Sequence, residues 1–342
     1  MDYSELCMSL CSVPGPSGFE DAARELITEK LQSFCDEVRT DAMGNIIAMR
    51  RSRAEGAKTL LLDAHMDEIG FIVTGHENGY LRFSTLGGID ARMLPAAEVK
   101  LLTAEPSYGV IDVMPVHALS KEDMDKALDA EKLFIDVGMS QNEAVEKIPV
   151  GTPGVYACSA SRLGEGSICG KSLDDRACAA IIIKAMEAVR DDDLGVNVCC
   201  LISTQEEVGM RGAIAGAFGV HPDYAIAIDV THGATPDAPK HKTLEMGKGA
   251  AIGLGPNCTR RLTDEIVAVA EEEKLPYQFE VMSGCSGTNG WAIQVSREGV
   301  ATAIVSLPIK YMHSPIETMR IEDGENIVRL LAAFIRRAGE VL

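Results

Sequence analysis

The chain has 342 residues, enough for two domains of ordinary size, each with its own core. Hydrophobic residues make up 46% of the chain and charged residues 24%, a balance typical of a globular protein in water. The formal net charge of −19 disfavours binding to nucleic acid or to an anionic membrane surface, because like charges repel.

The first quarter of the chain carries a helical pattern followed by two strand-like segments. Apolar residues recur with helical spacing over residues 20–34, and Ser17 and Glu20 stand at the spacing of a capping box. Runs of apolar residues then predict strands at residues 45–49 and 59–62. The second of these strands leads almost directly into a histidine.

The middle of the chain is predicted to be an inserted β-rich domain over residues 69–163. It opens with a hairpin signal, because Glu77-Asn78-Gly79 separates two β-like segments. The expected elements are strands at residues 69–74, 80–84, 99–103, 109–114 and 133–137, and helices at 121–130 and 141–147. Residues 1–68 and 164–342 would then form the other domain.

The last part of the chain alternates between helical and strand-like segments. Helices are predicted at residues 175–189, 263–274, 290–296 and 324–341, and strands at 196–203, 224–228, 278–282 and 301–306. This alternation predicts an α/β domain whose mixed, mostly parallel sheet is covered by helices.

Nothing at the start of the chain resembles an export signal. The first five residues include two acidic residues and no basic one, and no apolar stretch is long enough to span a bilayer. The ten cysteines have no paired zinc-finger spacing, and Cys199-Cys200 lies inside a strand-like run, where thiols act as small hydrophobes. We therefore expect a reduced, cytoplasmic protein.

Acidic and histidine side chains follow the apolar strand-like segments of the α/β part. They are His65 with Asp67, Asp174 with Asp175, Glu206 with Glu207, Asp229, and His313. Each has an ordinary explanation by itself, such as a core histidine, a helix cap or a solvated acidic corner. Together, two imidazoles and several carboxylates at one sheet edge are the donors of a two-metal hydrolytic site.

The segments that carry these side chains resemble metallopeptidase family 42, the TET-type aminopeptidases. The likeness lies in residues 63–71, 171–176, 205–213, 227–229 and 311–315. The family includes glutamyl aminopeptidases and proteins described as cellulases or endoglucanases. The resemblance implies a zinc-aminopeptidase-like α/β domain with two zinc or cobalt ions, an inserted β-rich dimerisation domain, and a tetrahedral dodecamer built from dimers.

The resemblance also implies a role for each residue. One metal would be held by His65 and Asp229, the other by Glu207 and His313, with Asp174 bridging them, Glu206 as the general base and Asp67 orienting His65. The nucleophile acting on the peptide substrate would be a hydroxide that bridges the metals. Asp175 is then expected to cap a helix, and His232, the rival ligand beside Asp229, to be a bystander.

One loop departs from the family pattern. This chain has Ser286-Gly287-Thr288-Asn289-Gly290 where the family commonly has Gly-Gly-Thr-Asp-Ala.

Two alternatives to an aminopeptidase stay open from sequence. An endoglucanase-like glycoside hydrolase needs only two carboxylates and aromatic platforms, for which a single tryptophan offers little. The other alternative is a particle that keeps the fold but does not catalyse a reaction.

Overall fold

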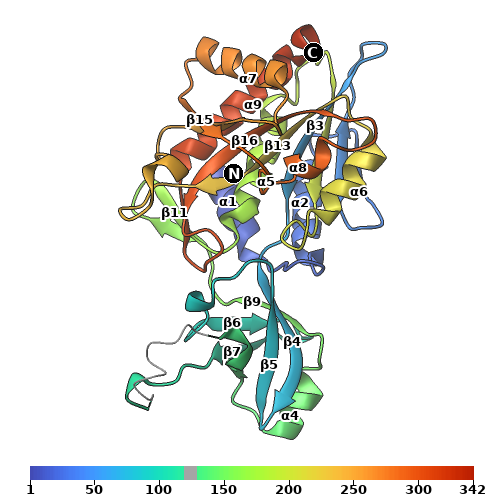
Figure 1. The fold of residues 1–342 in the computed structure, drawn as a ribbon. Coiled ribbons are helices and arrows are strands. Elements are labelled where there is room, and N and C mark those ends of the chain that lie inside the picture. Colours follow the sequence, from blue (N-terminus) through green and yellow to red (C-terminus); the bar gives the residue numbers. More distant parts are fainter. Residues whose placement is uncertain (119–128) are drawn as a thin grey trace.

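The protein consists of an α/β body joined to a small barrel (Figure 1). The computed structural model describes residues 1–118 and 129–342. The helix predicted at residues 121–130 falls almost entirely outside the described residues, and 130–132 form a short 3-10 turn. Within the described ranges, no helix is both long and apolar enough to cross a lipid bilayer.

The body contains a mixed sheet, with eleven strands in the described part of the chain. Its path is β1-β2-β12-β3-β13-β16-β17-β11-β10, and β14 joins β16 to β15 beside that path. The central neighbours β12, β3, β13 and β16 are parallel, whereas the flanking pairs β1–β2, β16–β17 and β11–β17 are antiparallel. The strands are β1 Glu37–Thr40, β2 Ile46–Arg50, β3 Thr59–His65, β10 Ser161–Leu163, β11 Ser167–Gly170, β12 Asn197–Ser203, β13 Tyr224–His232, β14 Ala250–Leu254, β15 Tyr277–Val281, β16 Ala301–Lys310 and β17 Glu317–Arg320.

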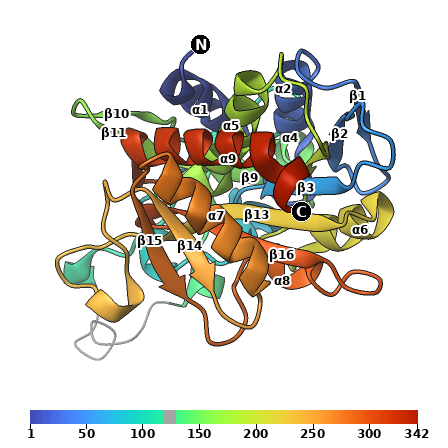
Figure 2. The same ribbon diagram turned by 90° about the horizontal axis from the view of Figure 1, so that it is seen from above.

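Helices cover both faces of this sheet, which confirms the predicted fold class. One face is covered by α1 Tyr3–Ser12, α2 Asp21–Leu31, α5 Leu173–Ala188, α7 Arg260–Glu272 and α9 Ile321–Val341. Figure 2 shows α9 running across this face with α5 and α7 beside it. The other face is covered by α6 Arg211–Val220 and α8 Gly290–Ile293.

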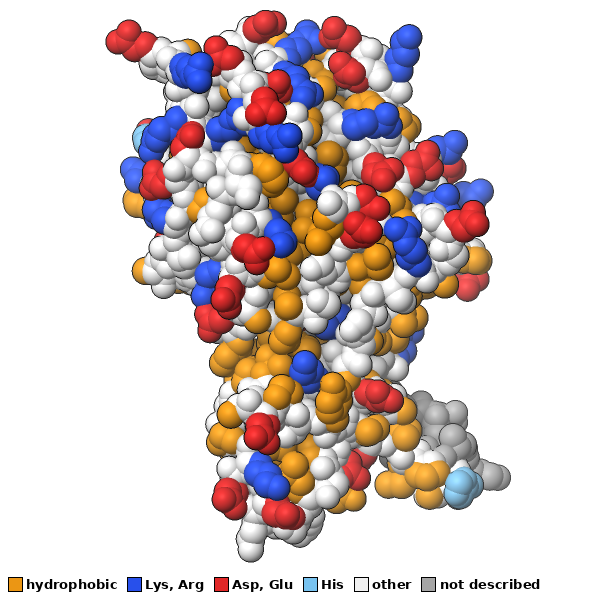
Figure 3. Space-filling model, turned by 180° about the vertical axis from the view of Figure 1, so that it is seen from behind, with side chains coloured by type: hydrophobic (Ala, Val, Ile, Leu, Met, Phe, Trp, Pro, Cys, Tyr) orange, Lys and Arg blue, Asp and Glu red, His pale blue; other side chains and the backbone are white. Residues whose placement is uncertain are grey.

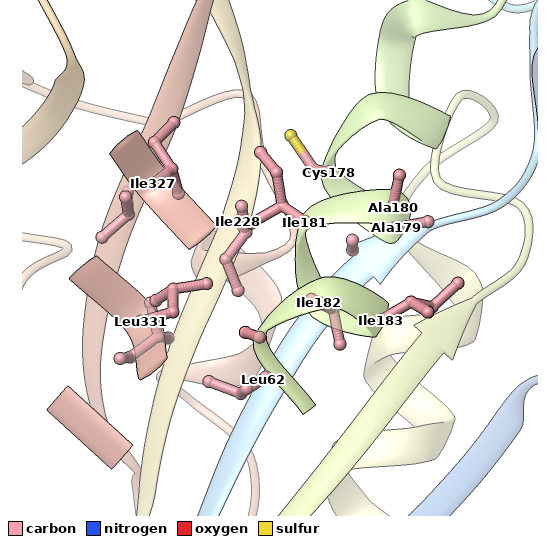
Figure 4. Close-up of a cluster of buried hydrophobic side chains, with 14 of the residues drawn as sticks. Leu62, Cys178, Ala179, Ala180, Ile181, Ile182, Ile183, Ile228, Ile327 and Leu331 are labelled. Carbon is pink, nitrogen blue, oxygen red and sulfur yellow. The ribbon is translucent and has the colours of Figure 1, made fainter. Parts of the chain in front are cut away.

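The larger core lies between the sheet and α5. Ile181 and Ile182 of α5 pack with Leu62 of β3, Ile228 of β13 and Leu331 of α9, all without solvent exposure or nearly so (Figure 4). Because the central strands are buried on both faces, their sequences are almost continuously apolar, as in other parallel sheets. This packing fixes the start of α5 against the ends of β3 and β13.

The barrel is a closed sheet in the order β4-β5-β8-β7-β6-β9. Its elements are β4 Gly70–Glu77, β5 Tyr80–Leu86, β6 Glu98–Leu101, β7 Ser107–Ile111, β8 Ile135–Asp136, α4 Gln141–Lys147 and β9 Pro153–Tyr156. Asn78 and Gly79 both have positive φ (55° and 93°), as the tight β4–β5 hairpin requires. Phe71 packs edge-on against Phe83 and Tyr156 in the barrel core. The predicted hairpin and most of the predicted strands therefore lie in one small barrel.

Candidate metal centre

The predicted donors meet at the end of the sheet that faces the barrel. His65 is the last residue of β3, and the chain enters the barrel at Gly70 (Figure 1). Ser203 of β12 lies opposite His65 in the parallel ladder, so the following Glu206-Glu207 segment leaves the sheet beside it. Parallel strands deliver their carboxyl ends to the same edge, which brings donors distant in sequence together.

The Asp174 carboxylate lies between the two histidines. Its Oδ1 is 3.1 Å from Nε2 of His65, and its Oδ2 is 3.2 Å from Nε2 of His313. Nε2 of His313 is also 3.4 Å from Oε2 of Glu207. One carboxylate thus contacts both imidazoles, each through a different oxygen.

Backbone carbonyls orient both imidazole rings. Nδ1 of His65 is 3.1 Å from the carbonyl oxygen of Asp67, and Nδ1 of His313 is 2.7 Å from the carbonyl oxygen of Gly88. A carbonyl can only accept, so each Nδ1 carries the hydrogen and donates it. Each Nε2 therefore faces the acidic side chains: when protonated it donates to Asp174, and once it loses that proton its lone pair is free to bind a metal.

Asp67 connects His65 to the two glutamates. Its Oδ1 is 3.4 Å from Nδ1 of His65 and accepts the backbone N–H of Glu206 at 3.0 Å. Its Oδ2 accepts the N–H of Glu207 at 3.2 Å and the hydroxyl of Ser17 at 2.6 Å. The predicted capping box at Ser17 is wrong, because α2 begins at Asp21 with Glu20 at its N-cap position and no side chain caps it, while the Ser17 hydroxyl donates to Asp67.

A second group of donors lies deeper in the protein. His65, Asp175 and Asp229 each offer a ligand atom, and these atoms lie within 4.8 Å of one another. The expectation that Asp175 caps a helix is wrong: its Oδ2 accepts the backbone N–H of His65 at 3.1 Å. The strand carrying Asp229 runs past its predicted end to His232, which is exposed and lies outside this group.

The cluster holds more acidic than basic groups. Burial, together with the nearby charge of Asp174, raises the pKa of Glu207 to about 8 and that of Glu206 to about 7. Burial also acts to raise the pKa of Asp174, but hydrogen bonds with His313 and His65 hold it well below its ordinary value.

This donor set fits divalent cations. Buried carboxylates need a positive partner, and carboxylates together with imidazoles are the ligands that zinc and similar metals accept. Within the described ranges, Oδ1 of Asp175 is buried without a hydrogen-bond partner, and Asp175 is a member of the deeper donor group. A cation bound there would satisfy that oxygen and offset the surplus negative charge.

Several residues that support the cluster were missed from sequence. Glu317 is buried and accepts the backbone N–H groups of both Asp174 and His313. Glu68 is also buried, and its carboxylate forms ion pairs with Nζ of Lys171 at 2.9 Å and Nη2 of Arg176 at 3.2 Å. The Glu68 pairs could have been suspected, because Glu68 directly follows Asp67, Arg176 directly follows Asp175, and Lys171 lies three positions before Asp174. Glu317 and Gly88 gave no such signal, because Asp174 lies 143 positions from Glu317 and His313 lies 225 positions from Gly88.

Comparison with known proteins supplies relatives over the full length. A family model described as M42 glutamyl aminopeptidase matches residues 44–330. A lysyl aminopeptidase from Pyrococcus furiosus is 34% identical, over 97% of this chain and 96% of its own length.

Solved structures agree with this fold. An aminopeptidase from the archaeon Desulfurococcus kamchatkensis superposes with a TM-score of 0.91 at 34% identity, covering 98% of this chain and 94% of its own. The TET1 peptidase of Pyrococcus horikoshii, which can assemble into a tetrahedron or a large octahedral shell, gives 0.86 at 32% identity, with 98% and 99% covered. A structure named endoglucanase from Thermotoga maritima gives 0.79 at 27% identity, with 98% of both chains covered.

Proposed function

The chain belongs to the M42 glutamyl aminopeptidase family, and from that premise we propose that it hydrolyses N-terminal residues from peptides with two divalent metal ions, zinc or cobalt. The observation that carries the two-metal part is the Asp174 carboxylate, which offers one oxygen to each imidazole. A carboxylate placed in this way suits the shared ligand of two neighbouring ions.

The proposed ligand scheme is the one that the family resemblance implies. His65 and Asp229 would hold one ion, Glu207 and His313 the other, and Asp174 both. When bound, such ions lower the pKa of water and polarise a carbonyl group. Asp175, buried beside His65 and Asp229, would add negative charge next to the deeper ion.

Glu206 is the proposed general base. Its backbone N–H donates to Oδ1 of Asp67 at 3.0 Å, and this bond holds Glu206 next to the residue that contacts His65. Its half-buried carboxylate would accept a proton from the attacking water and then deliver it to the leaving amine. Burial favours this task, because it moves the pKa of Glu206 toward neutrality.

Asp67 is proposed to act on position rather than on substrate. Its carboxylate contacts Nδ1 of His65, and its backbone carbonyl accepts from the same nitrogen. It also fixes the backbone of both Glu206 and Glu207. Asp67 would therefore set the distance between a ligand of one ion, a ligand of the other and the base.

The deciding experiment combines metal removal with a base variant. A chelator should abolish hydrolysis of aminoacyl chromogenic substrates, and zinc or cobalt should restore it. Glu206→Gln should keep its metal content and lose about 10²- to 10⁴-fold in kcat. Hydrolysis that survives complete demetallation would refute the two-metal proposal, and an unchanged Glu206→Gln variant would remove Glu206 from the reaction.

A glycoside hydrolase is the second candidate, because a structural relative is named endoglucanase. Glycosidases need two carboxylates on either side of a sugar, but they give no task to two imidazoles bonded to one aspartate. The comparison is direct: purified protein is assayed on β-glucan and on aminoacyl substrates, with and without bound metal. Metal-independent release of sugar would favour this candidate.

We propose that the chain assembles into dimers and then into a tetrahedral dodecamer, with residues 69–163 as the dimerisation domain. The barrel exposes large apolar side chains, including Tyr108 (65% exposed) and Met114 (61%). Hydrophobic side chains gather around the barrel and the narrow junction above it, whereas charged groups are spread over the body (Figure 3). Exposed apolar area of this kind is typical of protein interfaces. Light scattering of Tyr108→Lys against the native chain tests the role of the barrel.

A further inference from the structure

Glu317 links the backbones of two proposed metal ligands. It opens β17 and is 1% exposed. Its Oε2 accepts the N–H of Asp174 at 3.1 Å, and its Oε1 accepts the N–H of His313 at 2.9 Å. Oδ2 of Asp174 also contacts Nε2 of His313. The Glu317 carboxylate, the two backbone N–H groups and the two side chains therefore form a closed ring of contacts.

Both backbone segments need such a partner, because neither has a regular conformation. His313 has a φ of +60°, the left-handed region that non-glycine residues seldom adopt. Asp174 has φ −78° and ψ 103°, outside the helical range, although it lies at the start of α5. A buried N–H without an acceptor is costly, and Glu317 supplies acceptors for both.

A carboxylate is an expensive choice for a purely structural acceptor at this place. Glu317 is buried, and the nearby Asp174 repels it. A glutamine has nearly the same shape, but it has only one acceptor oxygen. Its NH₂ group would have to face the N–H of either Asp174 or His313, so one of the two bonds would always be lost. Two acceptors on one side chain, at fixed separation, are the property that only the carboxylate provides here.

We infer that Glu317 is a positioning residue that fixes Asp174 and His313 relative to each other and thereby sets the affinity and geometry of the metal bound between them. The inference rests on the proposed ligand roles of Asp174 and His313. Glu317 itself contacts neither substrate nor metal in this scheme. It acts through the backbone, as residues that orient ligands commonly do.

The matched pair of variants is Glu317→Gln and Glu280→Gln. Glu280 lies on β15 and also accepts two hydrogen bonds, from the hydroxyls of Thr231 and Ser306. Those hydroxyls can rotate to meet an amide, and they belong to no donor of the cluster. The two variants therefore make the same chemical change, one bonded to the backbone of two proposed ligands and one bonded only to hydroxyls of residues that are not ligands.

The readout is cobalt binding to the full-length protein, stripped of metal and titrated against a competing chelator. For Glu317→Gln we expect about 10- to 100-fold weaker binding of at least one ion and an altered visible absorption spectrum of the bound cobalt. With saturating metal, kcat should fall while KM stays near that of the native chain. Glu280→Gln should bind cobalt with the native affinity and spectrum.

The inference is overturned if Glu317→Gln keeps native cobalt affinity and spectrum and loses only thermal stability. Glu317→Asp is the second variant in case the first does not fold: its shorter side chain cannot reach both N–H groups, so the same cobalt phenotype is expected. If neither variant folds, Glu317 is a stability determinant and the inference falls. Failure of the proposed function is separate, since the native chain itself would then bind cobalt without hydrolysing peptides.

Discussion

The deep and outer halves of the donor cluster are held in different ways. In the deep half, His65 and Asp229 belong to the central strands β3 and β13, and the His65 side chain is 2% exposed. In the outer half, His313 stands in the turn between β16 and β17, and its side chain is 32% exposed. Its ring is held by Gly88, which lies in the loop after barrel strand β5. The core thus fixes one half, whereas a turn and a loop between the two parts of the molecule fix the other.

Asp174 joins the two halves, so its substitution should have the largest effect. Asp174→Asn exchanges one oxygen for an NH₂ group, which cannot accept a hydrogen bond from an imidazole or bind a cation. We expect loss of metal from both halves and at least about a hundredfold lower turnover. Metal content by elemental analysis and turnover of a chromogenic aminoacyl substrate measure this. A variant that keeps both ions would show that Asp174 does not connect the halves.

The two halves should release metal at different chelator concentrations. The outer ion is expected to leave first, because its histidine is more exposed and lies in a turn. His313→Ala should therefore retain about one ion per chain. His65→Ala should retain less, because the structure places His65 within reach of acidic donors in both halves. Native mass spectrometry counts the ions. Equal losses in the two variants would contradict the division into halves.

A smaller effect is expected from the loop that supports the outer half. Gly87 has a φ of +82°, and a Cβ there would lie 2.8 Å from Ile69 and 3.1 Å from Oε2 of Glu207. Gly87→Ala should weaken the outer ion about tenfold, in addition to about 1 kcal/mol of backbone strain. Gly56→Ala is the matched control, because Gly56 also has positive φ (69°) but an added Cβ would meet nothing within 4 Å. Equal cobalt affinities in the two variants would show that the contact of the added Cβ with Glu207 does not affect metal binding.

The smallest effect is expected in the core beneath the deep half. Ile182→Val removes one methylene from a fully buried side chain of α5 and should cost about 1 kcal/mol of unfolding free energy. Cobalt affinity should not change, because the strands and α5 keep their places. Chemical denaturation and cobalt titration provide the two measurements. A marked loss of affinity would mean that the deep half is less rigid than its packing indicates.

Sequence patterns were sufficient to bring the proposed donors to one edge of the sheet. Apolar runs end just before His65 and Glu206, and the strand rule then brings such residues to one edge. The same rule placed the end of the Asp229 strand too early, because the polar Asp229, Thr231 and His232 hide its continuation. Apolar periodicity carries no information about polar residues that stay inside a strand.

The supporting contacts could not be predicted, for a different reason. Glu317 accepts a hydrogen bond from Asp174, which lies 143 positions away in the sequence, and Gly88 accepts one from His313, which lies 225 positions away. Such bonds depend on the register of β17 with β11 and on how the barrel sits against the body. Asp175 was misjudged as a cap because aspartate is common at helix starts, whereas here it binds the N–H of His65. Local preference is a weak guide where tertiary contacts supply a stronger partner.

Gly88 has a practical consequence for protein engineering. It follows the β4–β5 hairpin, so any graft that exchanges the barrel for that of a relative also exchanges the carbonyl that orients His313. A foreign insert must therefore bring a flexible Gly-Gly step of its own, placed at the same distance from the hairpin. Chimeras designed to change particle size should be screened first for metal retention, since a well-folded hybrid could assemble correctly and still be inactive.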